Sequence, residues 1–68
     1  MARFLTTASS EFEAEMIRER LAEAGIAVLI EGTGASPRAF AGGKRDIYVE
    51  DEVLERAQEA LREAQEGG

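Results

Sequence analysis

Residues 10–26 read SEFEAEMIRERLAEAGI, and this stretch specifies a helix start, a helix stop and the beginning of a strand. Ser10 and Glu13 have the spacing of a capping box, in which the serine side chain accepts from the amide of Glu13 and the glutamate reaches back to the amide of Ser10. We therefore expect a helix to begin at residue 11. Its apolar stripe recurs at helical spacing and consists of Ala14, Ile17, Leu21 and Ala24.

The end of this helix is marked by Gly25. A glycine just after the last helical residue adopts a left-handed backbone without steric cost, and Ile26 can then fold back on Leu21 as the apolar contact of the cap. The helix is expected over residues 11–24. An apolar run follows at once and predicts a strand over residues 26–31.

The rest of the chain predicts two more strands and a second helix. Residues 3–8 and 46–50 have the β-branched and aromatic content of strands, and Asp51 is placed to cap a helix over residues 52–66. Residues 32–45 contain four glycines and the single proline of the chain, which indicates a loop. The expected apolar face of the second helix consists of Val53, Leu54, Ala57, Leu61 and Ala64. Two ion pairs are expected across one helical turn, Glu52 with Arg56 and Arg62 with Glu66.

The element order β-α-β-β-α predicts an α+β fold in one domain, residues 1–68. A right-handed crossover between the first two strands, with the third strand inserted antiparallel between them, gives the sheet order 1-3-2 with both helices on one face. This is a ferredoxin-like unit that lacks its last strand, so the edge of the first strand has no neighbour.

One face of this sheet is expected to remain without helices. Residues two apart on a strand share a face, so Leu29 and Tyr48 are expected on the outer face together with one of Phe4 or Leu5. A half-apolar sheet face is typical of an interaction surface, and we assign Leu29 and Tyr48 to a partner interface. The residues expected to face the helices on the third strand are Ile47 and Val49.

Length and composition limit the possible functions. The chain has 68 residues and neither cysteine nor histidine, which removes disulfides, thiolate chemistry and the usual zinc ligands. A core of this size is marginally stable alone, so we expect a homo-oligomer, a dimer or a trimer. The absence of cysteine and of a signal-peptide pattern at residues 1–8 predicts a cytoplasmic protein that does not enter a membrane.

The charge of the chain is unevenly distributed. The formal net charge is −6, which argues against nucleic acid as a partner because such proteins need a basic footprint. The loop of residues 32–45 contains Arg38, Lys44 and Arg45 and no acid. Arginine, lysine and glycine-rich backbone together can hold a phosphate or a carboxylate, so these three residues are a candidate anion site. The alternative is a solvated loop that binds nothing.

Phe40 is an aromatic residue within this glycine-rich loop. It either inserts into a partner or covers the end of the sheet, and we count it with the candidate partner interface.

The caps and core positions of this chain form a pattern that consists of Glu13-Ala14, Leu21 with Ala24-Gly25-Ile26, Ile47-Tyr48-Val49, and Glu50-Asp51-Glu52 with Leu54 and Ala57. In this pattern the chain resembles a known family of small bacterial domains, the putative prokaryotic signal-transducing proteins. The resemblance implies a fold related to that of the nitrogen-regulatory PII proteins and a role in signal transduction.

No catalytic, metal or cofactor site is predicted. The serines at residues 9–10 have no histidine to activate them, and the acids of both helices lie at water-facing positions. The leading hypothesis is therefore a non-enzymatic regulatory or adaptor domain that self-associates through its sheet and senses a small anion or a protein partner through the loop of residues 32–45. The alternative is a ubiquitin-like sulfur carrier or modifier, because the chain ends in Gly67-Gly68.

Overall fold

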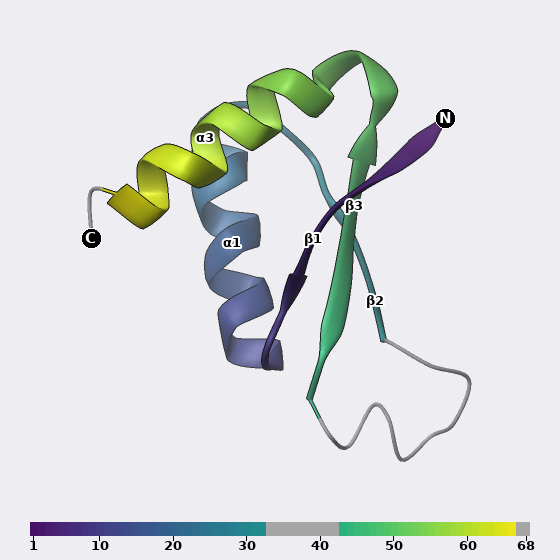
Figure 1. Cartoon of the computed structure of the whole chain (residues 1–68), viewed down its shortest axis with the longest axis vertical. Coiled ribbons are helices and arrows are strands. Elements are labelled where there is room, and N and C mark those ends of the chain that lie inside the picture. The colour runs from purple at the N-terminus through teal and green to yellow at the C-terminus, as the bar shows by residue number, and fades with distance from the viewer. Residues whose placement is uncertain (33–42, 67–68) are drawn as a thin grey trace.

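The computed structural model describes residues 1–32 and 43–66. Along the chain, strand β1 is followed by helix α1, strands β2 and β3, a short 3-10 turn η1 and helix α3 (Figure 1). Their bounds are β1 Ala2–Ala8, α1 Glu11–Glu23, β2 Leu29–Gly32, β3 Arg45–Glu50, η1 Asp51–Val53 and α3 Leu54–Glu66.

The three strands form one antiparallel sheet in the order β1-β3-β2. Both helices lie on the same side of this sheet, and α3 crosses the C-terminal end of α1 (Figure 1). The expected α+β fold of ferredoxin-like type is confirmed. Strand β1 forms one edge of the sheet, because its only neighbour within the described part of the chain is β3.

The start of α1 is capped largely as the sequence predicts. The amide of Glu13 donates to Oγ of Ser10 at 3.0 Å, which satisfies one of the amides that have no partner within the helix. The carboxylate of Glu13 accepts from the amide of Ser9 at 2.8 Å. The expectation that it reaches Ser10 is wrong, because the extended backbone at Ser10 (φ −156°, ψ 164°) leaves the preceding amide within reach.

The end of α1 confirms the predicted helix stop. Gly25 has φ +79°, the left-handed conformation that other residues rarely adopt. The amide of Ile26 donates to the carbonyl of Leu21 at 2.9 Å, and that of Gly25 to the carbonyl of Ala22 at 2.9 Å. This is the Schellman pattern, and Ile26 packs with Leu21 in one core cluster as its apolar contact.

The same cap explains why β2 begins later than expected. The predicted strand covered residues 26–31, whereas β2 pairs with β3 only from Leu29. The amide of Ile26 is used by the helix cap and is therefore not available to a strand ladder. Ile26 and Val28 still contribute to the core.

The core lies between the sheet and the helices. Ile47 and Val49 of β3 are 0% and 2% exposed, so the helices cover this face of β3 as predicted. Each belongs to its own buried cluster. Val49 packs with Leu21, Ile26 and Ala57, and Ile47 packs with Ala8 and Ala14.

A bulge in β1 decides which of two apolar residues enters this core. The register with β3 shifts between Phe4 and Thr6, so Leu5 is an extra residue on its strand. Leu5 packs against both buried clusters, whereas Phe4 is 53% exposed on the opposite face. The choice that the sequence left open is thus settled.

The second helix starts differently from the prediction. Asp51 does not cap it; residues Asp51–Val53 form a 3-10 turn without a side-chain cap, and the α-helix begins at Leu54. The carboxylate of Asp51 instead accepts from Nη1 of Arg3 at 2.8 Å, and its amide donates to the carbonyl of Met1 at 3.0 Å. Contacts with a strand that lies far away in sequence have replaced the local cap.

Arg56 also forms a longer-range contact than expected. Its guanidinium donates to the carbonyl of Ala24 at 3.1 Å, at the C-terminal end of α1, rather than pairing with Glu52. A cation is favoured there by the partial negative charge of the helix end. Arg62 pairs with Glu66 at 3.9 Å as predicted and also with Glu59.

Among the helices of the described residues, none combines the length and the apolar character that crossing a membrane would require.

Candidate functional site

The outer face of the sheet carries a row of three apolar side chains, one from each strand. Tyr48 of the central strand β3 is directly opposite Phe4 of β1 and Leu29 of β2 in the register of the sheet. The rings of Phe4 and Tyr48 meet edge to face, with centroids 5.9 Å apart and an interplanar angle of 79°. We call Phe4, Tyr48 and Leu29 the sheet-face row.

The sheet-face row is accessible because no described element covers it. Phe4 is 53% and Leu29 50% exposed, although phenylalanine and leucine are usually buried in the core. The helices lie on the opposite side (Figure 1). The sequence-predicted interface residues Leu29 and Tyr48 are therefore adjacent in the structure, and Phe4 joins them because of the bulge at Leu5.

Acidic residues lie on both sides of this row. On one side, Asp46 shares the outer face by strand alternation, and its register partners are Thr7 and Glu31. Thr7 donates its hydroxyl to the carboxylate of Asp46 at 2.9 Å. On the other side lies Glu50. The outer-face positions of the three strands thus include three acids and neither lysine nor arginine; they are Ala2, Phe4, Thr7, Leu29, Glu31, Asp46, Tyr48 and Glu50.

The N-terminal amine lies at the Glu50 end of this face. The amine of Met1 donates to Oε1 of Glu50 at 3.1 Å. This hydrogen bond, together with the negative charge of the same carboxylate, raises the pKa of the amine above its ordinary value of 8.0. Both groups are exposed, so the interaction adds order to the end of the sheet rather than a large stabilisation.

The residues of the predicted anion site are only partly within the described chain. Arg38 and Phe40 lie outside the described residues. Lys44 is exposed just before β3, and Arg45 is half-buried at its first position, where its guanidinium donates to the carbonyl of Lys44 at 3.0 Å. Arg45 pairs in register with Ala8 on the helix side of the sheet, away from the sheet-face row.

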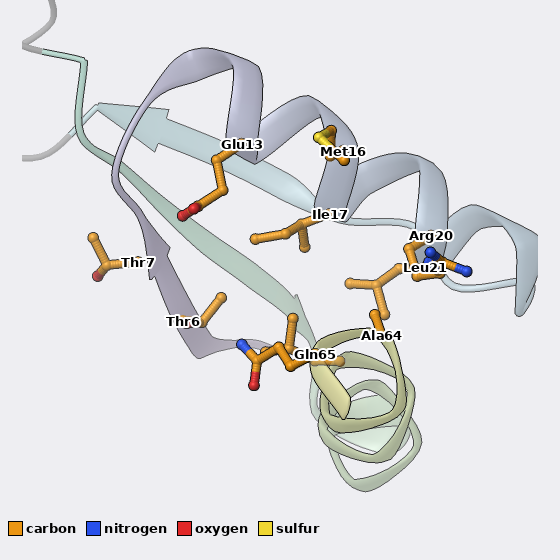
Figure 2. Close-up of a pocket in the computed structure, with 10 residues that line it drawn as sticks. Thr6, Thr7, Glu13, Met16, Ile17, Arg20, Leu21, Ala64 and Gln65 are labelled. Atoms are coloured by element: carbon orange, nitrogen blue, oxygen red, sulfur yellow. The ribbon is translucent and has the colours of Figure 1, made fainter. Parts of the chain in front are cut away.

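The structure also contains a groove that was not predicted from the sequence. A groove of about 310 Å³ runs between α1, α3 and the edge of β1. Figure 2 shows Ile17 and Leu21 pointing from α1 into this groove, toward Ala64 of α3. Among its lining residues, the signal that could have pointed to it is Met16, an apolar residue that falls outside the core stripe of α1.

The remaining predictions concern the C-terminal glycines and metal binding. Helix α3 continues to Glu66, so Gly67-Gly68 of the carrier hypothesis lie outside the described residues and that alternative stays a prediction. Within residues 1–32 and 43–66, no group of three or more acidic, histidine or cysteine side chains has the arrangement of a metal site.

Comparison with known proteins supplies the family. No curated protein and no solved structure shows significant similarity to the chain. A family model described as "Putative prokaryotic signal transducing protein" matches residues 2–65, which is nearly the whole chain. The match includes every strand and almost all of α3. The chain therefore belongs to the family of putative prokaryotic signal-transducing proteins.

Proposed function

We propose that this chain is a non-enzymatic regulatory or adaptor domain of the cytoplasm, and that it transmits a signal by binding a protein partner through the outer face of its sheet. The observation that supports this most strongly is the sheet-face row. Aromatic and aliphatic side chains that a core would normally bury are held at one level across three strands, on a face without helices, and two of them, Phe4 and Leu29, are half exposed.

The charges around the row indicate the kind of partner. Interfaces are commonly apolar at the centre and polar at the rim, with opposite charges facing each other across the rim. Here the rim is acidic, with Asp46 and Glu31 at one end and Glu50 at the other. The complementary partner is a protein segment with apolar side chains at its centre and lysine or arginine on both sides.

The same charges disfavour a second copy on this face. A two-fold axis that stacks the sheet on itself brings Asp46 near Glu50 of the second copy when the strands are antiparallel, and near its own equivalent when they are parallel. Carboxylates face each other in either case, which costs binding energy; the cost is larger in the parallel case, because in the antiparallel case the Glu50 carboxylate also contacts the Met1 amine. We therefore assign the sheet-face row to a different protein.

Tyr48 gives a direct readout of this interaction, because the chain has one tyrosine and no tryptophan. The probe is a short synthetic peptide with leucine and valine at its centre and lysines at both ends, titrated against the tyrosine fluorescence. Saturable change of the emission is expected. A matched peptide with glutamates at both ends should leave the emission unchanged, and a lysine-flanked peptide with a serine centre should bind far more weakly.

Two variants test whether the signal arises at the proposed face. Phe4→Ala removes one member of the row and should weaken peptide binding by about tenfold or more, as expected for an aromatic anchor. Phe12→Ala removes an exposed phenylalanine from α1, on the other side of the molecule, and should leave binding unchanged. Equal affinity for the lysine-flanked and glutamate-flanked peptides, or equal loss in the two variants, would refute the proposal.

A small anion is a second candidate ligand, favoured by the charge of residues 32–45. That segment has three bases and no acid in a chain whose net charge is −6. If Arg38, Lys44 and Arg45 hold a phosphate, phosphorylated metabolites should raise the melting temperature more than chloride at matched ionic strength. A ligand at 100 times its Kd contributes about 2.7 kcal/mol. The effect should disappear when all three bases are replaced by glutamine; equal responses would leave the segment without a ligand.

A further inference from the structure

Helix α1 carries two large apolar side chains on its outward side. Phe12 is 75% and Met16 53% exposed, and they lie one helical turn apart. The inward side of the same helix is the one that fills the core, through Ala14 and Leu21. Phe12 and Met16 therefore form a second apolar strip, separate from the core stripe and on the opposite layer from the sheet-face row.

The groove between α1, α3 and β1 lies directly beside this strip. Met16 belongs to its lining, so the strip and the groove form one continuous surface. Figure 2 shows the interior of the groove between Ile17 and Leu21 of α1, Thr6 of β1 and Ala64 of α3. A volume of about 310 Å³ with an apolar interior is large enough to receive a side chain from outside.

The charges along the groove are arranged with opposite signs at its two ends. Glu13 lines it near the start of α1 and Arg20 lines it about two turns later. Arg20 is exposed and has no hydrogen bond or ion pair to any residue among 1–32 and 43–66. A surface with an acid at one end and a base at the other is complementary to itself after a rotation of 180°.

We propose that α1 and this groove form a two-fold interface with a second copy of this chain. The two α1 helices run antiparallel, with the axis passing between Met16 and Ile17. In this register Glu13 faces Arg20 of the second copy, Met16 faces Ile17 of the second copy, and both contacts occur twice. Phe12 lies at the edge of this contact and covers the end of the second copy's groove, whose floor includes the buried Leu21.

This interface leaves the sheet face free and does not depend on the proposed function. It also meets a need of the fold, because the two buried clusters of a 68-residue chain are small and an apolar interface extends them. A second copy supplies an apolar side chain to cover the groove and a charge opposite to that of Glu13 at one end and of Arg20 at the other.

Sedimentation equilibrium on the full chain tests the interface. The parent should sediment as a dimer of the 7.4 kDa chain at hundreds of micromolar. Phe12→Ala should raise the dimer Kd by about tenfold or more, because the interface contains this residue twice. The matched control is Phe4→Ala, an exposed phenylalanine of the sheet face, which should leave the Kd unchanged. A monomeric parent, or a Kd that responds to Phe4→Ala and not to Phe12→Ala, would overturn the proposal.

Charge reversal tests the register. Arg20→Glu should dissociate the dimer, because Glu13 then faces a glutamate. Arg18→Glu makes the same change in net charge on another side of α1 and should not dissociate it. A chain carrying Glu13→Arg should also be monomeric, and an equimolar mixture of it with Arg20→Glu should restore a dimer, since both pairs are again opposite in charge.

Glu13 also caps α1, so circular dichroism must first show that Glu13→Arg is folded. If it is not, the comparison of Arg20→Glu with Arg18→Glu decides by itself. Equal dissociation by these two variants, or a mixture of folded variants that stays monomeric, would contradict the interface.

Discussion

Gly25 has a backbone conformation that the end of α1 requires. Its φ of +79° ends α1, yet a Cβ added to it would meet no atom within 4 Å. Any cost of a side chain there is therefore backbone strain and not a clash. We expect Gly25→Val to lower the free energy of unfolding by about 1–3 kcal/mol, because β-branched residues resist the left-handed region.

Urea denaturation followed by circular dichroism measures this cost. Gly25→Asn is the matched control, since asparagine tolerates the left-handed conformation and should retain much of the stability. A valine variant with the denaturation midpoint of the parent would show that the helix does not depend on this cap.

The pKa of the N-terminal amine should depend on the Glu50 carboxylate. The carboxylate raises the pKa of the Met1 amine above 8.0, so the stabilisation is fully present below the unfolded-state pKa and is lost as the pH rises through the folded-state pKa. Titration of the amine by NMR should give a higher pKa in the parent than in Glu50→Gln. Identical pKa values in the two chains would mean that the contact is not maintained in solution.

At the scale of elements, the bulge in β1 sets which of two neighbouring apolar residues faces the helices and which faces outward. Leu5 packs against both core clusters and Phe4 points to the outer face. Leu5→Ala should therefore cost about 2 kcal/mol or more, the usual price of a cavity in a core, whereas Phe4→Ala should cost less than half of that. Thermal denaturation of the two variants checks this, and the reverse order of stabilities would show that the strand pairs without the bulge.

The elements differ in how far local sequence could predict them. The helix stop at Gly25 was predictable because its hydrogen bonds join residues within one turn. The start of the second helix was not, because Asp51 is held by Arg3, and the two residues are separated by most of the chain. The bulge at Leu5 also depends on pairing with β3, and residues 3–8 alone do not specify it.

In the candidate site, too, some features follow from local sequence and others depend on long-range packing. Leu29 and Tyr48 were predicted on the outer face because strand alternation is a local rule. That Phe4 and not Leu5 lies on the outer face follows only from the register of β1 with β3. The groove beside α1 depends on how α3 crosses α1, which the sequence pattern of either helix does not contain.

At the scale of the whole molecule, the chain is a thin two-layer structure with principal extents of 32 × 30 × 14 Å. Each layer has an outward apolar surface: the sheet-face row on one and the strip of Phe12 and Met16 on the other. In our proposal the strip and its groove bind a second copy, and the sheet face binds a partner with basic flanks. A dimer would then present two sheet faces, so two partner segments could bind at once with increased avidity.

The central claim is that the sheet-face row is the partner surface. Its most direct test is a map of amide chemical-shift changes in the isotopically labelled chain as the lysine-flanked peptide is added. We predict that the shifts concentrate at Phe4, Leu29 and Tyr48 and in the adjacent strand residues, and that the exposed side of α1 stays unchanged. Shifts confined to residues 12–20, or none at any peptide concentration, would contradict it.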